Sequence, residues 1–167
     1  SYLPPETSED QNTQDPHRIV ACSAAPDHLW CQHHDGIWRS TDAAASWQRI
    51  GAVPVSDFGF AVAVDPTDPQ RAWFVPAQAD VCRIPVDGRM VVLRTDDGGR
   101  SFRAFGDGLP ASHAYHLVYR HALDVDASGQ VLAMGSTTGG LWVSADAGEH
   151  WQELSRDLPP LATVRFA

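Results

Sequence analysis

Residues 40–47 have the sequence Ser-Thr-Asp-Ala-Ala-Ala-Ser-Trp, and the same pattern occurs twice more in the chain. Residues 95–102 are Thr-Asp-Asp-Gly-Gly-Arg-Ser-Phe, and residues 144–151 are Ser-Ala-Asp-Ala-Gly-Glu-His-Trp. Each copy has a hydroxyl residue, an Asp two positions later, a small residue two positions after the Asp, and an aromatic residue three positions after that. The Asp residues are 55 and 49 positions apart, a spacing that indicates a solenoid or a propeller.

Each copy of the pattern lies between two short apolar or alternating segments, which predicts strand, turn and strand. A short carboxylate can accept hydrogen bonds from amides a few residues further on, and glycine takes the positive φ that a tight turn needs. The first copy has Ala44 where the other two have glycine, which weakens this turn without abolishing it.

Two more strands are predicted before each turn. The first strands are expected at 18–22, 60–64 and 121–125, and the second at 29–32, 72–75 and 131–134. Polar turn segments separate them at 25–28, 65–69 and 126–129. Four short antiparallel strands per repeat is the pattern of a propeller blade. No stretch has the 3.6-residue apolar period of a helix, so little helix is expected.

The sequence therefore predicts an all-β fold of three four-stranded antiparallel blades in one propeller domain. The expected boundaries are an irregular arm at 1–16, blades at 17–57, 58–112 (with an insertion at 76–90) and 113–158, and an extra closing strand at 159–167. Closed propellers have ~4–8 blades, so this chain is expected to be part of a larger propeller. The remaining blades would come from another chain, from a second copy, or from sequence removed from this one.

The repeated turns resemble the Asp-box (BNR) repeats of sialidase-like glycoside hydrolases, sortilin-type receptors and photosystem assembly propellers. From about Asp15 to Ala167 the chain resembles the C-terminal part of bacterial BNR-repeat proteins. The repeat is informative about fold and poor in information about function. Asp42, Asp97 and Asp146 occur once per blade inside their own turns, so they are interpreted as structural residues rather than catalytic carboxylates.

Composition limits the classes of partner. The net charge is −9 and all 12 basic residues are arginine, which argues against a nucleic-acid footprint. No apolar run approaches the ~18 residues of a membrane helix. Cys22, Cys31 and Cys82 form no metal-type pair, and a Cys22–Cys31 disulfide is left open. An odd total of three cysteines fits a reducing, cytoplasmic compartment better, with secretion as the alternative.

Connections in a four-stranded meander alternate between the two ends of the blades. The Asp turns should share one end with the turns between first and second strands. Six of the eight histidines map to the opposite end, which suggests a ligand site there. The ligand-binding candidates are His17, His33, His34, Asp35, Asp57, Arg83, His116, Tyr119, Arg120 and His121.

Three interpretations of these histidines stay open. His17, His33 or His34, His116 and His121 could converge with Asp35 or Asp57 as a metal site of nitrogen and oxygen ligands. They could instead line a polar ligand-binding channel mouth, or support loops through hydrogen bonds. No HExxH-type spacing is present, so no cofactor is expected, and a metal is the alternative.

The resemblance to sialidases implies a Tyr nucleophile assisted by Glu, an Asp acid/base and three arginines. Tyr115, Tyr119, Arg120 and the Arg83-Ile84-Pro85 tripeptide are the matching pieces, but the only glutamates are Glu6, Glu9, Glu149 and Glu153. Catalytic residues therefore stay unknown. One hypothesis is a propeller module that binds a polar small molecule, a glycan or a protein partner. The other is an exo-sialidase-like glycoside hydrolase completed by the missing blades or by a homo-oligomer.

Overall fold

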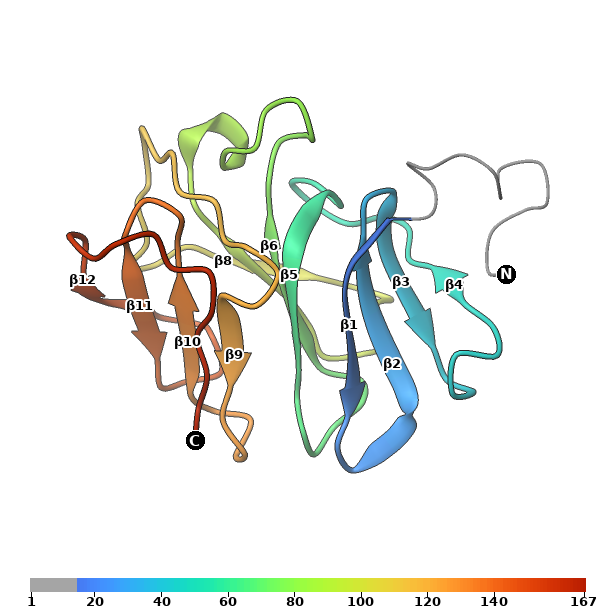
Figure 1. Cartoon of the computed structure of the whole chain (residues 1–167). Helices are drawn as coiled ribbons and strands as arrows, with labels where there is room; N and C mark the ends of the chain where they lie inside the picture. Colours follow the sequence, from blue (N-terminus) through green and yellow to red (C-terminus); the bar gives the residue numbers. More distant parts are fainter. Residues whose placement is uncertain (1–14) are drawn as a thin grey trace.

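The computed structural model describes residues 15–167, so most of the predicted arm at 1–16 lies outside the described residues. Three antiparallel sheets follow one another along the chain, and each is a meander of four consecutive strands (Figure 1). The all-β fold of three four-stranded blades is thereby confirmed.

The first blade contains β1 (Pro16–Cys22), β2 (Ala25–His33), β3 (Gly36–Ser40) and β4 (Gln48–Arg49). The second contains β5 (Gly59–Val64), β6 (Ala72–Pro76), β7 (Val92–Thr95) and β8 (Arg103–Phe105). The third contains β9 (Leu123–Val125), β10 (Leu132–Gly135), β11 (Leu141–Ser144) and β12 (Gln152–Ser155).

Residues 15–167 contain no α-helix, as the lack of helical periodicity predicts; a single 3-10 turn, η3 (Val86–Gly88), lies in the β6–β7 insertion. Nothing helical in this part of the chain has the length and apolar character that a membrane span requires.

The first hairpin differs from the prediction. The turn is at Ser23 and Ala24, because β2 already begins at Ala25, opposite Cys22. Cys31 then pairs with Ile19 rather than with Cys22, and the cysteines are free, so the disulfide hypothesis is wrong. Burial raises the pKa of the Cys31 thiol to about 12, which keeps it protonated and unreactive.

The hydrophobic core lies between neighbouring blades. The innermost strands β1, β5 and β9 pack side by side, and every residue of β5 is buried. Trp30 of β2 and Phe74 of β6 meet edge to face between the first two blades, with ring centroids 5.8 Å apart. Trp73 and Trp142 belong to the cluster between the second and third blades. Apolar side chains of adjacent sheets thus interlock around a common axis.

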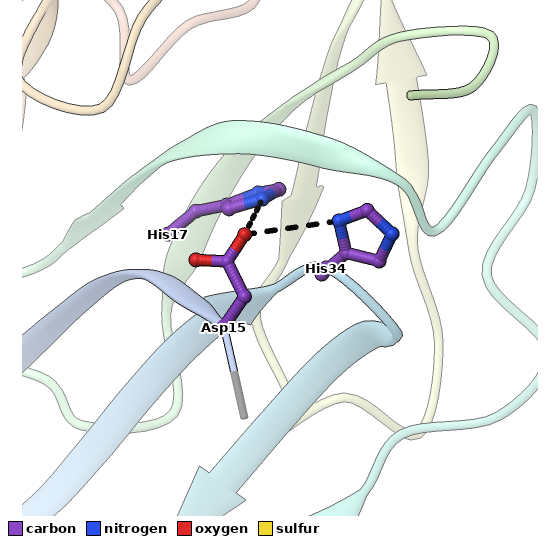
Figure 2. Close-up of side chains that lie close together, drawn as sticks. All are labelled: Asp15, His17 and His34. Atoms are coloured by element: carbon purple, nitrogen blue, oxygen red, sulfur yellow. Dashed lines mark ion pairs between the residues drawn. The ribbon is translucent and has the colours of Figure 1, made fainter. Parts of the chain in front are cut away.

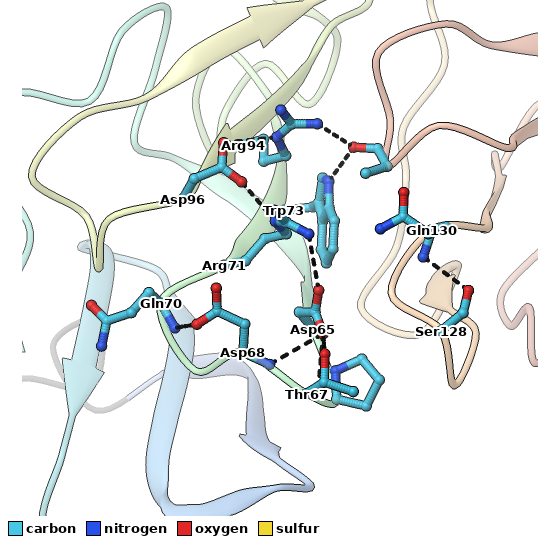
Figure 3. Close-up of polar contacts among 12 residues, drawn as sticks. Asp65, Thr67, Asp68, Gln70, Arg71, Trp73, Arg94, Asp96, Ser128 and Gln130 are labelled. Atoms are coloured by element: carbon cyan, nitrogen blue, oxygen red, sulfur yellow. Dashed lines mark hydrogen bonds and ion pairs between the residues drawn. The ribbon is translucent and has the colours of Figure 1, made fainter.

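Tryptophan side chains also form hydrogen bonds across both blade junctions. Trp30 Nε1 donates to the Pro69 carbonyl of the second blade (3.1 Å), and Trp73 Nε1 donates to the Ala147 carbonyl of the third (2.8 Å). Arg94 Nη1 donates to the same Ala147 carbonyl (2.9 Å), and Arg94 also pairs with Asp96, as Figure 3 shows. The second junction is therefore held by polar contacts as well as by apolar burial.

The C-terminal segment corrects one expectation. Residues 162–167 form no strand: Thr163 makes a single parallel bridge with His121, and Val164 N donates to the His121 carbonyl (2.9 Å). Arg165 pairs with Asp124, so the segment lies against its own blade.

The three repeated turns have the same internal hydrogen bonds. In the second copy Ser101 N and Oγ donate to the two carboxylate oxygens of Asp97 (2.9 and 2.6 Å), and Thr95 Oγ1 accepts from Gly99 N (2.9 Å). The turns at Asp42 and Asp146 repeat these contacts. Each Asp thus points into its own turn, as predicted.

These turns should make stability depend on pH at the acidic end. Hydrogen bonds from the Ser101 side chain and backbone lower the pKa of Asp97 to about 2, against about 3.9 in an unfolded chain. Burial opposes ionisation of Asp146, but hydrogen bonds from His150 and Ser144 outweigh it and lower its pKa to about 2 as well. Because both folded pKa values are depressed, their contribution is complete above about pH 4 and is lost as pH falls toward 2.

We expect the urea midpoint of the protein to fall between pH 4 and pH 2, measured by intrinsic fluorescence. In Asp97→Asn the fall should be shallower, since asparagine still accepts from Ser101 N but does not titrate. An equally steep fall in Asp97→Asn would show that this turn does not contribute to the acid sensitivity.

Candidate functional site

The two ends of the blades carry different residues. One end, the box end, carries the three Asp turns and the turns between first and second strands. The other, the loop end, carries the β2–β3 and β10–β11 turns, the β6–β7 insertion and the connections between blades (Figure 1). His121 lies two residues before β9 at the loop end, whereas Asp97 lies two residues after β7 at the box end. The predicted segregation of the Asp turns from most histidines is therefore present.

Three aromatic rings from three blades are stacked near the axis at the loop end. His17 of β1 is stacked on Phe60 of β5, with ring centroids 4.4 Å apart and planes inclined by 16°. Tyr119, in the segment that leads to β9, is stacked on the same Phe60 at 5.4 Å and 18°. The stack forms because β1, β5 and β9 are the innermost strands and pack side by side. It places one side chain from each blade at a common point.

Two guanidinium groups adjoin this stack. Arg83 of the insertion lies 5.3 Å from the centroid of the Phe60 ring, and Arg120 lies 5.7 Å from it and 5.8 Å from that of Tyr119. Such cation–π contacts hold a guanidinium in place without neutralising its charge. Arg83 also pairs with Asp80, whereas no carboxylate of residues 15–167 pairs with Arg120.

The backbone of Arg120 is fixed from the first blade. Arg18 Nη1 donates to the carbonyls of Arg120 (2.7 Å) and Leu123 (2.9 Å), so a buried guanidinium on β1 ties down the approach to β9. Burial lowers the pKa of Arg18 to about 10, and the group stays charged at neutral pH. Arg120 therefore has an anchored main chain and a partly exposed side chain.

A second group of polar side chains, Asp15, His17 and His34, meets as Figure 2 shows, and it adjoins the stack because His17 belongs to both. Asp15 Oδ2 lies 3.4 Å from His17 Nε2 and 3.8 Å from His34 Nδ1. Asp15 and His17 are two positions apart in an extended segment, so their side chains share a face. His34 is held opposite, because its N–H donates to the Asp15 carbonyl (3.0 Å). The three side chains thus lie where the paired strands β1 and β2 adjoin, at the start of β1 and just after the end of β2.

The hydrogen atom on His17 can be placed from its partner. Nδ1 lies 2.6 Å from the Gly59 carbonyl oxygen, which can only accept, so Nδ1 carries the hydrogen. Burial lowers the pKa of His17 and thereby favours the neutral ring. In that form Nε2 directs its lone pair toward the Asp15 carboxylate.

The other five predicted site residues lie elsewhere on the loop end. His33 is buried in the β2–β3 turn, where Nδ1 accepts from Asp35 N (2.9 Å). Asp35 and Asp57 both face Arg49 Nη2, at 3.7 and 3.1 Å. His116 contacts Thr138 and Ser136, at 2.5 and 3.2 Å, and meets Trp142 edge to face.

His121 faces Arg165 of the C-terminal segment, with His121 Nδ1 3.2 Å from Arg165 Nη2. The predicted convergence of His116, His121, Asp35 and Asp57 with His17 is therefore not formed. Of the predicted set, the structure gathers His17, His34, Arg83, Tyr119 and Arg120 around Phe60.

Sequence reasoning missed Asp15, Phe58 and Phe60. Asp15 was assigned to the irregular arm, although its spacing of two from His17 was a usable signal. Phe60 was placed in a core strand, and Phe58 among loop residues; Phe58 in fact lies edge-on to both His17 (5.8 Å) and His34 (5.6 Å). These rings form an apolar wall for the histidines.

No protein-family profile matches the chain, and no curated protein matches it. Solved structures do. The GH74 enzyme of Niastella koreensis is similar over 89% of this chain and 22% of its own length, with 16% identity and a TM-score of 0.65. The GH74 xyloglucanase of Xanthomonas campestris is similar over 82% of this chain and 20% of its own, with 25% identity and a TM-score of 0.60.

A third similar structure is YCF48 from Cyanidioschyzon merolae, matched over 89% of this chain and 42% of its own, with 17% identity and a TM-score of 0.57. Another YCF48 structure, bound to a D1 peptide, matches 84% of this chain with 16% identity and a TM-score of 0.57. The chain spans about a fifth of the GH74 structures and about two fifths of the YCF48 structures. These likenesses establish the fold: the three sheets are blades of the β-propeller type, consistent with part of a larger propeller.

Proposed function

We propose that this protein is a propeller module that binds an anionic polar ligand, a carboxylated sugar foremost, at the axial part of its loop end. The observation that carries this proposal is Arg120. Its guanidinium is partly exposed, adjoins the Phe60 and Tyr119 rings, and has no carboxylate partner in residues 15–167. A planar guanidinium fork matches a carboxylate in geometry and charge.

The neighbouring groups support the same ligand class. Arg83 adds a second guanidinium next to the same ring, and its partner Asp80 lies in the β6–β7 insertion rather than in the stack. The Tyr119 hydroxyl and the His34 imidazole add hydrogen-bonding groups beside an apolar ring surface. Sugars and small organic acids are bound by such mixtures of a few polar groups on an aromatic wall.

We further propose that the chain is an Asp-box propeller, on the strength of the three repeated turns and their shared hydrogen-bond pattern. A glycoside hydrolase completed by other blades is the second candidate function. The GH74 neighbours favour it, as propellers of which this chain spans about a fifth. The carboxylate could also belong to a protein ligand, since one YCF48 structure holds a peptide.

Calorimetric titration tests the first proposal. The probes are N-acetylneuraminic acid, glucuronic acid and a short peptide with a free C-terminal carboxylate, each beside its neutral ester or amide. We expect at least one acid to bind more tightly than its neutral counterpart. Arg120→Ala should weaken that binding by about tenfold or more, because a hydrogen bond to a charged group contributes roughly 1.5–3 kcal/mol.

Arg120→Lys is the matched control, since it keeps the charge and loses the planar fork. Its affinity for the acid should lie between that of the parent and that of Arg120→Ala. Equal binding of acids and neutral counterparts, or no effect of Arg120→Ala, would contradict the proposal. The hydrolase candidate is tested by turnover of aryl-glycosides, aryl-sialosides and xyloglucan oligosaccharides. Turnover that is lost in Arg120→Ala would show that the protein is an enzyme and not only a binding module.

A further inference from the structure

We infer that Asp15, His17 and His34 form a binding site for a divalent transition-metal ion, with Zn²⁺ as the expected occupant. One ligand atom from each residue lies within 4.8 Å of those of the other two. Asp15 Oδ2 lies 3.4 Å from His17 Nε2 and 3.8 Å from His34 Nδ1 (Figure 2). Two imidazoles and one carboxylate are a donor set that zinc and related ions take, whereas calcium and magnesium prefer oxygen ligands.

The hydrogen bond of His17 orients this ligand. Its Nδ1–H donates to the Gly59 carbonyl, so a neutral ring has its free lone pair on Nε2, the atom nearest Asp15. A lone pair facing a carboxylate oxygen at 3.4 Å is unfavourable unless a proton or a cation lies between them. Metal-binding histidines regularly donate their other N–H to a carbonyl in this manner, which fixes both tautomer and ring orientation.

The His17 ring and the backbone that joins His34 to Asp15 are both held in place by contacts. His17 is buried, stacked on Phe60 and edge-on to Phe58, so its ring is locked. The backbone bond from His34 N to the Asp15 carbonyl holds the other two residues at a fixed separation. Bonds of 2.0–2.1 Å in a tetrahedral site place ligand atoms about 3.3 Å apart, close to the Asp15–His17 distance of 3.4 Å.

His34 must approach the other two ligands by a small movement. Its side chain is 23% exposed, lies at the β2–β3 turn and meets the His17 and Phe58 rings edge to face, each at 5.6 Å. The Asp15 side chain is 46% exposed, so the remaining coordination positions face solvent. An ion held by three protein ligands with an open side can bind water or a ligand atom, as catalytic rather than structural zinc sites do.

Arg120 is the unfavourable neighbour, because its positive charge acts on His17. A bound cation would also place positive charge beside Arg83 and Arg120, and so strengthen the field that attracts an anion. The two sites can still be tested separately: removal of the Arg120 charge should leave metal binding saturable, whereas changes of Asp15 or His34 should weaken metal binding.

The experiment is calorimetric titration of tag-free, chelator-treated protein with ZnCl₂, repeated with CoCl₂ and visible spectroscopy. We expect one equivalent of Zn²⁺ to bind and Co²⁺ to give the absorption of a low-coordinate site. Asp15→Asn, a nearly isosteric change, and His34→Ala should each weaken binding by at least about tenfold. His113→Asn, at an exposed loop-end histidine with positive φ, is the matched control and should bind as the parent does.

A second readout identifies the ligand atoms. In histidine-labelled protein, Zn²⁺ should shift the nitrogen resonances of His17 Nε2 and His34 Nδ1 and leave those of His116 and His121 in place. Arg120→Ala should retain saturable Zn²⁺ binding, which separates failure of this site from failure of the anion site. Absence of saturable binding, unchanged affinity in Asp15→Asn and His34→Ala, or shifts at other histidines would overturn the inference and leave the cluster as an ion pair.

Discussion

Trp73→Ala should lower the free energy of unfolding by about 3–5 kcal/mol, the usual result of removing a buried tryptophan. Trp73 is fully buried in the cluster between the second and third blades, and its indole N–H bonds to the Ala147 carbonyl. The change therefore opens a cavity at a junction and removes a bond that crosses it. Urea unfolding followed by circular dichroism measures the loss.

Trp73→Phe separates the contribution of the filled ring volume from that of the indole hydrogen bond. The Ala147 carbonyl keeps a donor in this variant, because Arg94 Nη1 still bonds to it at 2.9 Å. No buried acceptor is left without a partner, so Trp73→Phe should cost only about 1–2 kcal/mol, for one hydrogen bond and a smaller ring. If Phe and Ala destabilise equally, the junction depends on the indole N–H and not on the filled volume.

Gly108→Ala should destabilise the protein by about 3 kcal/mol or more. Gly108 has a φ of +79°, and a Cβ there would lie 1.7 Å from the Trp151 carbonyl oxygen. The obstacle is backbone, fixed by the bond from Trp151 N to the Asp107 carbonyl (2.9 Å). The segment between the second and third blades would have to move away from the buried Trp151. Thermal and urea unfolding of the purified variant are the measurements.

Gly51→Ala is the control for this change. No atom lies within 4 Å of a Cβ at Gly51, and its φ is outside the positive range. Its stability should stay within about 0.5 kcal/mol of the parent, or rise slightly through the smaller entropy of the unfolded chain. Comparable losses in the two variants would show that close backbone approach at Gly108 is not the reason for the glycine.

The blades could be predicted because their signals are local. A turn such as 95–102 contains its own donors and acceptors within eight residues, so the sequence alone specifies its shape. The alternation around it then gives the strands. The same reasoning failed at residues 162–167, where a β-like run follows two prolines and makes only one bridge. It also misplaced the first hairpin turn, and with it the pairing of Cys22.

The site was only partly predictable, because its contacts join residues that are far apart in the sequence. The topology of a meander assigns His17, His34, Arg83 and Arg120 to one end, and this assignment is correct. Which of them touch depends on contacts between blades, such as Phe60 with Tyr119, and these have no signature in sequence spacing. His116 and His121 share the end but contact Thr138 and Arg165 instead. Asp15 was missed because an extended residue before a strand looks like part of an arm.

Both tryptophan bonds at the blade junctions end on main-chain oxygen atoms, one in the turn between β5 and β6 and the other in an Asp turn. An amide oxygen is present whatever side chain the residue carries, and here the acceptors are a proline and an alanine. The accepting position in the first junction is thus free of any demand on its side chain for this bond, whereas Ala147 of the second is itself buried with a φ of 57°. Substitution should accordingly be tolerated at Pro69 more readily than at Ala147 or at the two indole donors.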